Sequence, residues 1–355
     1  MKVLLCVHSL SGGGAETQLK LLANYIALEG VEVAIFCIDD KGVQFQHDSI
    51  RLFKISNKEK YPKETVFEII KVLEIFKPDV IHAWLPPSIT IPSMIAGAIK
   101  KVPCITSYRN RLHFDSWLRV LDWFFVLMLS KKIVSNNIIE HSAIQFRWLF
   151  TRKKGEIIPN AVCIDDIYKI PYLKRQNSTF KILFVGRLVE QKNWKTLFDA
   201  LLKIDTKKQW ILQVCGDGEQ RVEAEIYAKN HNLACKIEFL GFRSDVHKIM
   251  SESHLLVLPS WHEGMANVAL EAMATGLPCL LSDIDANRSL VKNSGASLLN
   301  DPKDVAGFAC KIQKAIDGEL SLSQLSERGL RLAESYDSKK MALTYKNLYK
   351  KVMSN

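Results

Sequence analysis

The feature that most constrains the fold of this chain is an alternation of short apolar runs with longer helical patterns. The short runs are typical of buried strands, and their alternation with helices predicts βαβ units and parallel sheets. One series of such units begins at residue 2, and a second begins at residue 180, after a polar stretch over residues 172–179. The sequence therefore predicts an α/β protein with two Rossmann-like, doubly wound domains.

The domain boundaries follow from the polar stretch. We expect an N-terminal domain over residues 1–170 and a C-terminal domain over residues 171–335. A last helix over residues 336–355 has no strand after it, and we expect it to pack back on the N-terminal domain. A length of 355 residues agrees with two domains, because single domains usually hold about 100–200 residues.

Individual elements can also be placed from the pattern. The expected strands lie at residues 2–10, 31–38, 79–85, 103–108, 131–137, 180–188, 209–219, 236–242, 255–261 and 278–283. The expected helices lie at residues 17–30, 193–204, 222–232, 245–254, 266–276 and 338–352.

Composition indicates whether the protein is globular, membrane-spanning or secreted. With 48% hydrophobic and 24% charged residues, the chain is typical of a folded globular protein. The longest apolar run, Trp123–Leu129, is far shorter than the roughly 17–25 residues of a spanning helix. No charged-then-apolar signal segment opens the chain. The eight cysteines form no CxxC pair, and Cys6, Cys37, Cys215 and Cys279 lie in apolar strand-like runs. We therefore expect these four to be reduced, buried thiols in a cytoplasmic protein, with no zinc site or disulfide framework.

Three loops that follow predicted strands carry candidate site residues, because ligands of open α/β sheets bind at the carboxyl ends of strands. The first loop is Ser11–Glu16, which holds three consecutive glycines before a helix. Glycine lets the backbone approach a ligand, and a helix N-terminus offers N–H groups to an anion. A plain βα turn is the alternative. A dinucleotide fold is also conceivable, since Asp39 and Asp40 follow the second strand, but the GxGxxG spacing is absent because Thr17 occupies the third glycine position.

The second loop is the segment FVGRLVEQKN over residues 184–193. Arg187 and Lys192 follow the strand within six residues of its end at Gly186. Two cations at this place could neutralise the charge that develops on a diphosphate leaving group without a metal ion. Two solvated surface cations are the alternative.

The third segment, residues 262–272, contains two glutamates eight residues apart. Glu263 follows a strand, and Glu271 interrupts an otherwise apolar helix. A carboxylate in such a helix is costly unless it is paired or bound. Adjacent ribose hydroxyls are suitable partners, and an internal salt bridge is the alternative. The helix start at Gly264–Asn267 would offer free N–H groups to a phosphate.

Taken together and in this order, these segments resemble glycosyltransferase family 4, whose members have the GT-B fold. GGGAE resembles the family's GGAE loop, FVGRLVEQKN its VGRLxxxKG segment, IPNAVCID its IPNGVD link, and EGMANVALEAMATGLP its paired-glutamate signature. The resemblance covers nearly the whole chain. It implies two domains facing across a cleft, which close over a nucleotide-sugar donor. It also implies transfer with retention of the anomeric configuration, without a metal or other cofactor and without a dedicated general base.

The resemblance further implies a role for each matching residue. The donor diphosphate would be held by Arg187, Lys192, Gly13 and Gly14, and the ribose would be held by Glu271. The donor sugar and phosphate would contact Glu263 and the amides of Gly264, Met265, Ala266 and Asn267. The base would be bordered by Phe242 and Arg243. Of these, Arg187, Lys192 and Glu263 would act in catalysis. Two departures from the family pattern concern this site: Arg109 stands where many members carry a histidine near the donor sugar, and Asn193 replaces a glycine.

The basic excess of the chain is local. The net charge is +10, and residues 100–154 hold eleven Lys and Arg against three Asp and Glu, a local balance of +8. Within this stretch, an aromatic and apolar run is flanked by basic side chains, which suits contact with an anionic membrane surface or a lipid-linked acceptor. The residues concerned are Trp117, Arg119, Trp123, Phe124, Lys131 and Lys132. A buried helix is the alternative, because Trp123–Leu129 is apolar on every face.

The sequence thus predicts a retaining glycosyltransferase that moves a hexose or N-acetylhexosamine, with UDP as the expected nucleotide. The expected acceptor is a lipid-linked glycan or a cell-surface polysaccharide, such as lipopolysaccharide or capsule. The enzyme would lie in the cytoplasm, peripherally on the inner face of the cell membrane. A soluble sugar acceptor and a non-catalytic partner subunit are the alternatives. Nucleic acid is not an expected partner, since the aromatic residues cluster in one apolar run.

Overall fold

The structure is a computed structural model of the whole chain. It describes residues 1–10, 13–39, 45, 47–55, 62–84, 86–108, 126, 128–136, 155–164, 172, 179–292 and 294–354.

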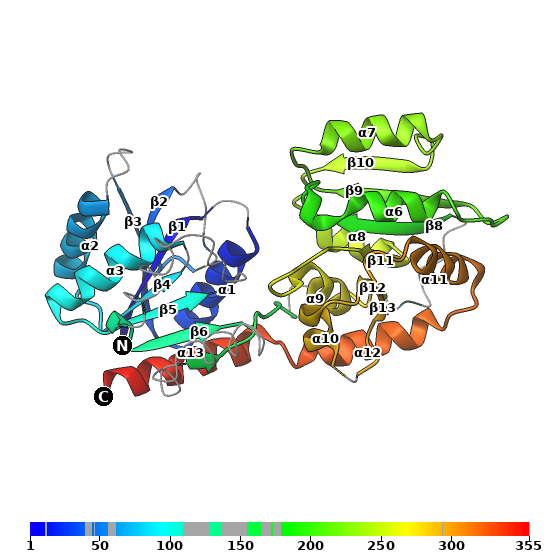
Figure 1. Ribbon diagram of the computed structural model, residues 1–355. Helices are drawn as coiled ribbons and strands as arrows, with labels where there is room; N and C mark the ends of the chain where they lie inside the picture. Colours follow the sequence, from blue (N-terminus) through cyan, green and yellow to red (C-terminus); the bar gives the residue numbers. More distant parts are fainter. Residues whose placement is uncertain are drawn as a thin grey trace. The chain divides into compact units, whose positions relative to one another are not determined.

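The chain divides into two compact units (Figure 1). The first unit holds Met1–Ala161 together with Ser338–Asn355, and the second holds Val162–Asp337. The predicted boundary at residue 170 lies inside the second unit. The side chain of Val162 is buried in the core of the second unit. Val162 also forms a parallel β-bridge with Asp337, and its amide donates to the Tyr336 carbonyl at 2.9 Å. The chain therefore joins the second unit before the polar stretch begins.

The first unit contains a seven-stranded sheet in the order β3-β2-β1-β4-β5-β6-β7, with every neighbouring pair parallel. Its strands are β1 (Lys2–Ser9), β2 (Glu32–Asp39), β3 (Arg51–Lys54), β4 (Val80–Trp84), β5 (Cys104–Tyr108), β6 (Lys132–Ser135) and β7 (Gly155–Ile157). The described helices that accompany it include α1 (Gly14–Leu28), α2 (Pro62–Phe76) and α3 (Pro87–Lys100). The strand order reverses between β1 and β4, which is where open sheets of this kind bind ligands.

The last helix, α13 (Ser338–Met353), belongs to the first unit although it follows the second in sequence. Tyr345 and Tyr349 are fully buried, and the Tyr349 hydroxyl lies 2.6 Å from Nδ1 of the buried His82 on β4. The Lys346 ammonium donates to the Glu29 carbonyl at 2.6 Å, just after α1. Apolar burial and these polar contacts together hold the end of the chain on the first sheet.

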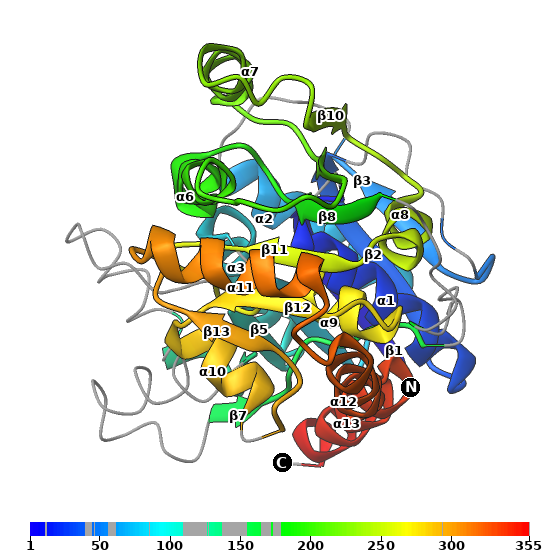
Figure 2. The same ribbon diagram turned by 90° about the vertical axis from the view of Figure 1, so that its right-hand side faces the viewer.

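The second unit contains a six-stranded sheet in the order β10-β9-β8-β11-β12-β13, again parallel throughout (Figure 2). Its strands are β8 (Phe180–Val185), β9 (Trp210–Cys215), β10 (Ile237–Gly241), β11 (Leu255–Leu258), β12 (Cys279–Ser282) and β13 (Leu298–Asn300). Among the residues described in this unit, the helices are the short 3-10 helix η2 (Glu190–Lys192), α6 (Trp194–Leu201), α7 (Arg221–Asn230), α8 (Val246–Glu252), α9 (Asn267–Ala274), α10 (Asp285–Val291), α11 (Val305–Asp317) and α12 (Leu322–Glu334). α6 packs against α11, and α9 packs against α12.

The inner strands of both sheets, such as β1, β4, β11 and β12, are largely apolar and buried, as expected for strands covered on two faces. Cys6, Cys37, Cys215 and Cys279 lie buried within these strands as free thiols, which confirms their predicted place in the core. Burial raises the pKa of the Cys6 thiol to about 12. Within the described part of the chain, no helix combines the length and the apolar character needed to cross a bilayer.

Candidate active site

Three glycines bring the loops at the carboxyl edge of the second sheet into close contact. Gly186 follows β8, Gly216 follows β9, and Gly241 ends β10. The Gly186 amide donates to the Cys215 carbonyl at 2.9 Å, and the Gly216 amide donates to the Gly241 carbonyl at 2.7 Å. Gly216 has a φ of +137°, and a Cβ atom there would lie 2.0 Å from the Gly186 carbonyl oxygen. The loops after β8 and β9 can be this close only because Gly216 lacks a side chain.

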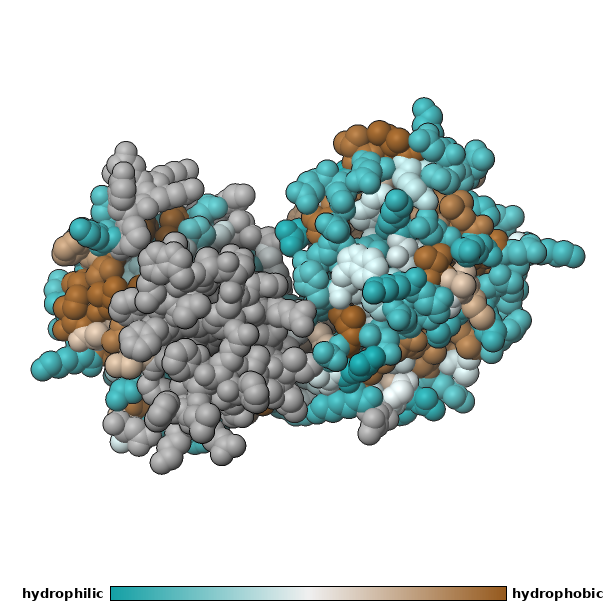
Figure 3. Space-filling model, viewed as in Figure 1, coloured by the Kyte–Doolittle hydropathy of each residue, from teal (hydrophilic) through white to brown (hydrophobic). Residues whose placement is uncertain are grey.

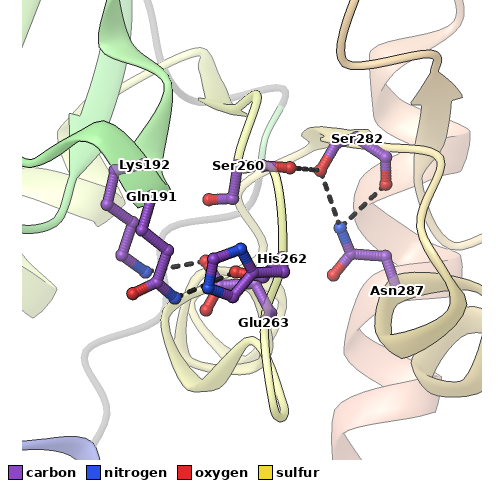
Figure 4. Close-up of polar contacts among 7 residues, drawn as sticks. All are labelled: Gln191, Lys192, Ser260, His262, Glu263, Ser282 and Asn287. Carbon is purple, nitrogen blue, oxygen red and sulfur yellow. Dashed lines mark hydrogen bonds and ion pairs between the residues drawn. The ribbon is translucent and has the colours of Figure 1, made fainter. Parts of the chain in front are cut away.

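Lys192 and Glu263, which lie 71 residues apart in sequence, form an ion pair at this edge (Figure 4). The Lys192 ammonium donates to Glu263 Oε1 at 2.7 Å, and the two side chains are only 16% and 10% exposed. The Lys192 side chain passes over Gly186, where a Cβ atom would lie 3.4 Å from Cε of the lysine. The structure thus brings together two of the predicted catalytic residues. Arg187, the third, is exposed on the same loop after β8.

Hydrogen bonds tie the loop of Lys192 to the loop of Glu263 (Figure 4). The Trp261 amide donates to the Gln191 carbonyl at 2.9 Å, and the Gln191 side-chain amide donates to the His262 carbonyl at 2.9 Å. The loop of Glu263 is also fixed from its other side, where the buried Ser282 hydroxyl donates to the Ser260 carbonyl at 2.7 Å. The ion pair therefore sits in a pre-organised frame.

Asn193 occupies the family's glycine position for a conformational reason. Its φ is +52° and its ψ is 39°, the left-handed region that asparagine tolerates best among residues with a Cβ atom. Its buried side-chain amide donates to the Pro259 carbonyl at 3.0 Å and to the Pro302 carbonyl at 3.1 Å, and its oxygen accepts from the Thr196 hydroxyl at 2.9 Å. The departure from glycine adds ties between the loops after β8, β11 and β13.

Replacing Asn193 by glycine should keep the backbone conformation and remove these ties. Because three neutral hydrogen bonds are lost and each contributes about 0.5–1.5 kcal/mol, we expect a loss of about 1.5–4.5 kcal/mol in the free energy of unfolding. Denaturant titration measures it. Asn232→Gly is the matched control, since Asn232 has a φ of +58° and is exposed on the turn after α7. Equal effects of the two variants would contradict a role for the Asn193 side chain.

Glu271 lies in the second turn of α9 and has a described partner. Its Oε2 is 3.7 Å from Nε2 of His247 on α8, and the side chains are 24% and 47% exposed. The nearby carboxylate of Glu271 raises the pKa of His247. An internal pair was one of the two alternatives for Glu271. This pair leaves part of the carboxylate exposed.

The helix α9 starts where the sequence predicts, but not every backbone amide at its start is free. The helix begins at Asn267, and no side chain caps it. The Asn267 amide is not free, because it donates to the Met265 carbonyl at 2.9 Å. The expectation of a free amide at Asn267 is therefore wrong. A short turn before the helix uses this amide.

The residues predicted to border the base differ in their availability. Phe242 directly follows β10 and is 80% exposed. The Arg243 guanidinium instead binds Asp245 through two hydrogen bonds, Nε to Oδ1 at 2.8 Å and Nη2 to Oδ2 at 2.7 Å. The arginine lowers the pKa of that carboxyl. An aromatic ring is thus exposed at this end of β10, beside a guanidinium that already has a partner.

The predicted glycines of the first unit lie at the start of α1. Gly13 is the N-cap residue and Gly14 the first helical residue, so the helix starts three residues earlier than predicted. A Cβ atom on Gly13 would lie 2.0 Å from Oε2 of Glu16. The Glu16 carboxylate thus folds back over the helix start, where a negative charge is favourable.

Several predicted contacts of the acceptor and membrane lie outside the described residues. These are Arg109, Trp117, Arg119, Trp123 and Phe124. Lys131 is exposed, and the Lys132 ammonium pairs with Glu156 at 3.2 Å.

Two residues of the site had no sequence signal. Gln191 joins the two catalytic loops through its side chain, and His247 contacts Glu271 from another helix. Polar residues in loops and short helices are common: Gln191 occupies an unspecified position of the VGRLxxxKG segment, and His247 belongs to no motif. Only the packing of the loops after β8 and β11, and of α8 against α9, reveals them.

Two family models match the chain. Residues 12–166 match the model for "Glycosyltransferase Family 4", and residues 170–331 match that for "Glycosyl transferases group 1". An Escherichia coli UDP-Gal:alpha-D-GlcNAc-diphosphoundecaprenol alpha-1,3-galactosyltransferase is 29% identical over 280 residues, covering 72% of this chain and 71% of its own. A lipopolysaccharide core biosynthesis glycosyltransferase of Rhizobium meliloti is 24% identical and covers 91% of each chain.

The fold also has relatives among solved structures. Anabaena HepE in complex with UDP and glucose superposes with a TM-score of 0.82 at 19% identity, covering 99% of this chain and 100% of its own. At this identity the likeness concerns the fold alone, which is the predicted GT-B fold of two parallel-sheet α/β domains.

Proposed function

The chain belongs to glycosyltransferase family 4, and on that premise we propose that it transfers a hexose or N-acetylhexosamine from a nucleoside-diphosphate sugar to a lipid-linked or lipopolysaccharide acceptor. The observation that carries the donor part is the Lys192–Glu263 pair at the carboxyl edge of the second sheet. In the proposed complex, the lysine binds the donor diphosphate and the glutamate contacts the donor sugar. UDP is the proposed nucleotide.

The proposed chemistry uses charges that the chain itself supplies. As the glycosidic bond to the diphosphate breaks, negative charge develops on the leaving oxygen. Lys192 and the exposed Arg187 neutralise that charge, which is the role that pre-organised cations fill in low-dielectric sites. Glu263 contacts the donor sugar and holds the lysine in place. The leaving phosphate accepts the proton of the acceptor hydroxyl on the same face, so the anomeric configuration is retained and no metal is required.

The acceptor part of the proposal rests on the relatives and on the surface of the first unit. The E. coli relative is named for a diphosphoundecaprenol acceptor, and the Rhizobium relative for lipopolysaccharide core biosynthesis. On the first unit, Phe67 and Ile75 of α2 and Ile99 of α3 are each more than half exposed, and apolar surface is visible on this unit (Figure 3). We therefore place the enzyme on the inner face of the cell membrane.

Membrane association should depend on lipid charge. Each basic residue near an anionic surface contributes about 1 kcal/mol, and the stretch over residues 100–154 carries a balance of +8. We expect the protein to float with vesicles that contain anionic lipid at low salt and to sediment away from neutral vesicles. Equal flotation with both vesicle types would contradict the proposal.

Nucleotide binding offers a test that does not require the acceptor. Glu271→Gln should weaken UDP binding about tenfold or more, because a hydrogen bond to a charged group contributes about 1.5–3 kcal/mol. Isothermal titration with UDP, GDP, ADP and dTDP measures the affinity and identifies the base. Glu327→Gln on α12 is the control, since Glu327 is 68% exposed in a surface pair with Arg331. An unchanged affinity of Glu271→Gln would overturn the ribose assignment.

A further inference from the structure

Among the residues that the structure describes, His247 lies outside every recognised motif and contacts Glu271, the residue predicted to bind the donor ribose. It lies on α8, whose packing against α9 brings its Nε2 to 3.7 Å from Oε2 of Glu271. The carboxylate projects from a helix that is otherwise apolar, where a charge without a partner is costly. We propose that His247 is a positioning residue for the nucleotide: its imidazolium holds one oxygen of Glu271, so that the other oxygen is directed to the ribose hydroxyls.

The surroundings of His247 support this assignment. Of the described residues, Glu271 is the charged group that reaches it from a neighbouring helix. On its own helix, Lys248 and Glu252 are its charged neighbours in sequence, and Asp245 before the helix is already bound by Arg243. The imidazole therefore has one carboxylate with which to pair. At 47% exposure of His247 and 24% of Glu271, solvent still reaches the pair, and so could a ligand.

The pair makes donor binding depend on pH. Glu271 raises the pKa of His247 above its ordinary value of 6.5. The His247 ring is protonated at pH values below that ordinary value, and it loses its charge as the pH rises through the raised pKa. Nucleotide affinity should therefore fall between pH 6 and pH 8.5. Partly exposed ion pairs contribute little, so we expect about a two- to fivefold loss.

His247→Gln separates positioning from a purely structural role. Glutamine keeps an N–H donor but does not titrate. We compare the UDP affinity of the wild type with that of His247→Gln at each pH. The ratio of the first affinity to the second should fall about two- to fivefold from pH 6 to pH 8.5. Protonation of UDP itself affects both proteins equally and so cancels in this ratio. His247→Ala should bind more weakly than His247→Gln at both pH values. His231→Gln is the matched control, because the described contacts of the His231 ring are stacking on Tyr227 and a hydrogen bond from Nδ1 to the Tyr227 carbonyl near the end of α7.

The outcomes distinguish this inference from the proposed function on which it rests. If the wild type binds none of UDP, GDP, ADP and dTDP, the proposed function fails. If it binds one of them and the affinity ratio stays constant across the pH range, the role of His247 is overturned. The same conclusion follows if His247→Ala matches the wild type at pH 6. A falling ratio, with His231→Gln unchanged, supports the inference.

Discussion

Replacing Lys192 by methionine should lower donor turnover by about 10²- to 10³-fold, the loss typical of removing one group that stabilises developing negative charge. Methionine keeps the length of side chain that packs over Gly186, so the change removes mainly the ammonium. Because the charge matters most in the transition state, kcat should fall more than the affinity for UDP. Release of nucleotide from UDP-sugars, measured by a coupled assay, gives both quantities without knowledge of the acceptor.

The loss must be separated from the cost of an unpaired carboxylate. Glu263 is only 10% exposed, so removal of Lys192 leaves it buried without its cation. The double variant Lys192→Met, Glu263→Gln removes both charges and should recover thermal stability but not turnover. Lys195→Met is the control for a nearby cation. Lys195 lies on α6, and its ammonium is 5.6 Å from the centre of the Tyr227 ring. Near-normal turnover of Lys192→Met or of the double variant would refute the diphosphate assignment.

The sequence predicted the fold where burial imposes a clear pattern. Strands covered on both faces are continuous apolar runs, so β1, β4, β8 and β11 were placed within a few residues. The short edge strand β3 escaped detection, because its four residues begin and end with a charged side chain. No element was assigned to α3, which is largely apolar and contains Pro92 inside the helix. Its sequence has no polar face to reveal the period.

The candidate site was predictable where local sequence carries the chemistry. The spacing of Glu263 and Glu271 sets one after a strand and the other on a helix, and the structure places them so. Partners from elsewhere in the chain could not be inferred. The contact of Lys192 with Glu263 depends on the order of β8 and β11 in the sheet, and that of Glu271 with His247 on the packing of α8 against α9.

Replacing Gly216 by alanine should destabilise the second unit by about 3 kcal/mol. A φ of +137° is a region that residues with a Cβ atom rarely adopt, which costs about 1–3 kcal/mol. In addition, the new Cβ would lie 2.0 Å from the Gly186 carbonyl oxygen, and the clash involves backbone that cannot swing away. Calorimetry should show a fall of about 6–12 °C in the transition of this unit. Because Lys192 packs over Gly186, turnover should fall with it.

Gly318→Ala tells the clash apart from the cost of a positive φ alone. Gly318 ends α11 in the same unit with a φ of +81°, and its nearest neighbour to an added Cβ is the flexible end of Lys208 at 3.8 Å. That variant should lose only about 1–2 kcal/mol, the cost of a left-handed backbone, and should keep its turnover. If Gly216→Ala were no less stable than Gly318→Ala, the loops after β8 and β9 would have room to separate. The frame that holds Lys192 would then not depend on their contact.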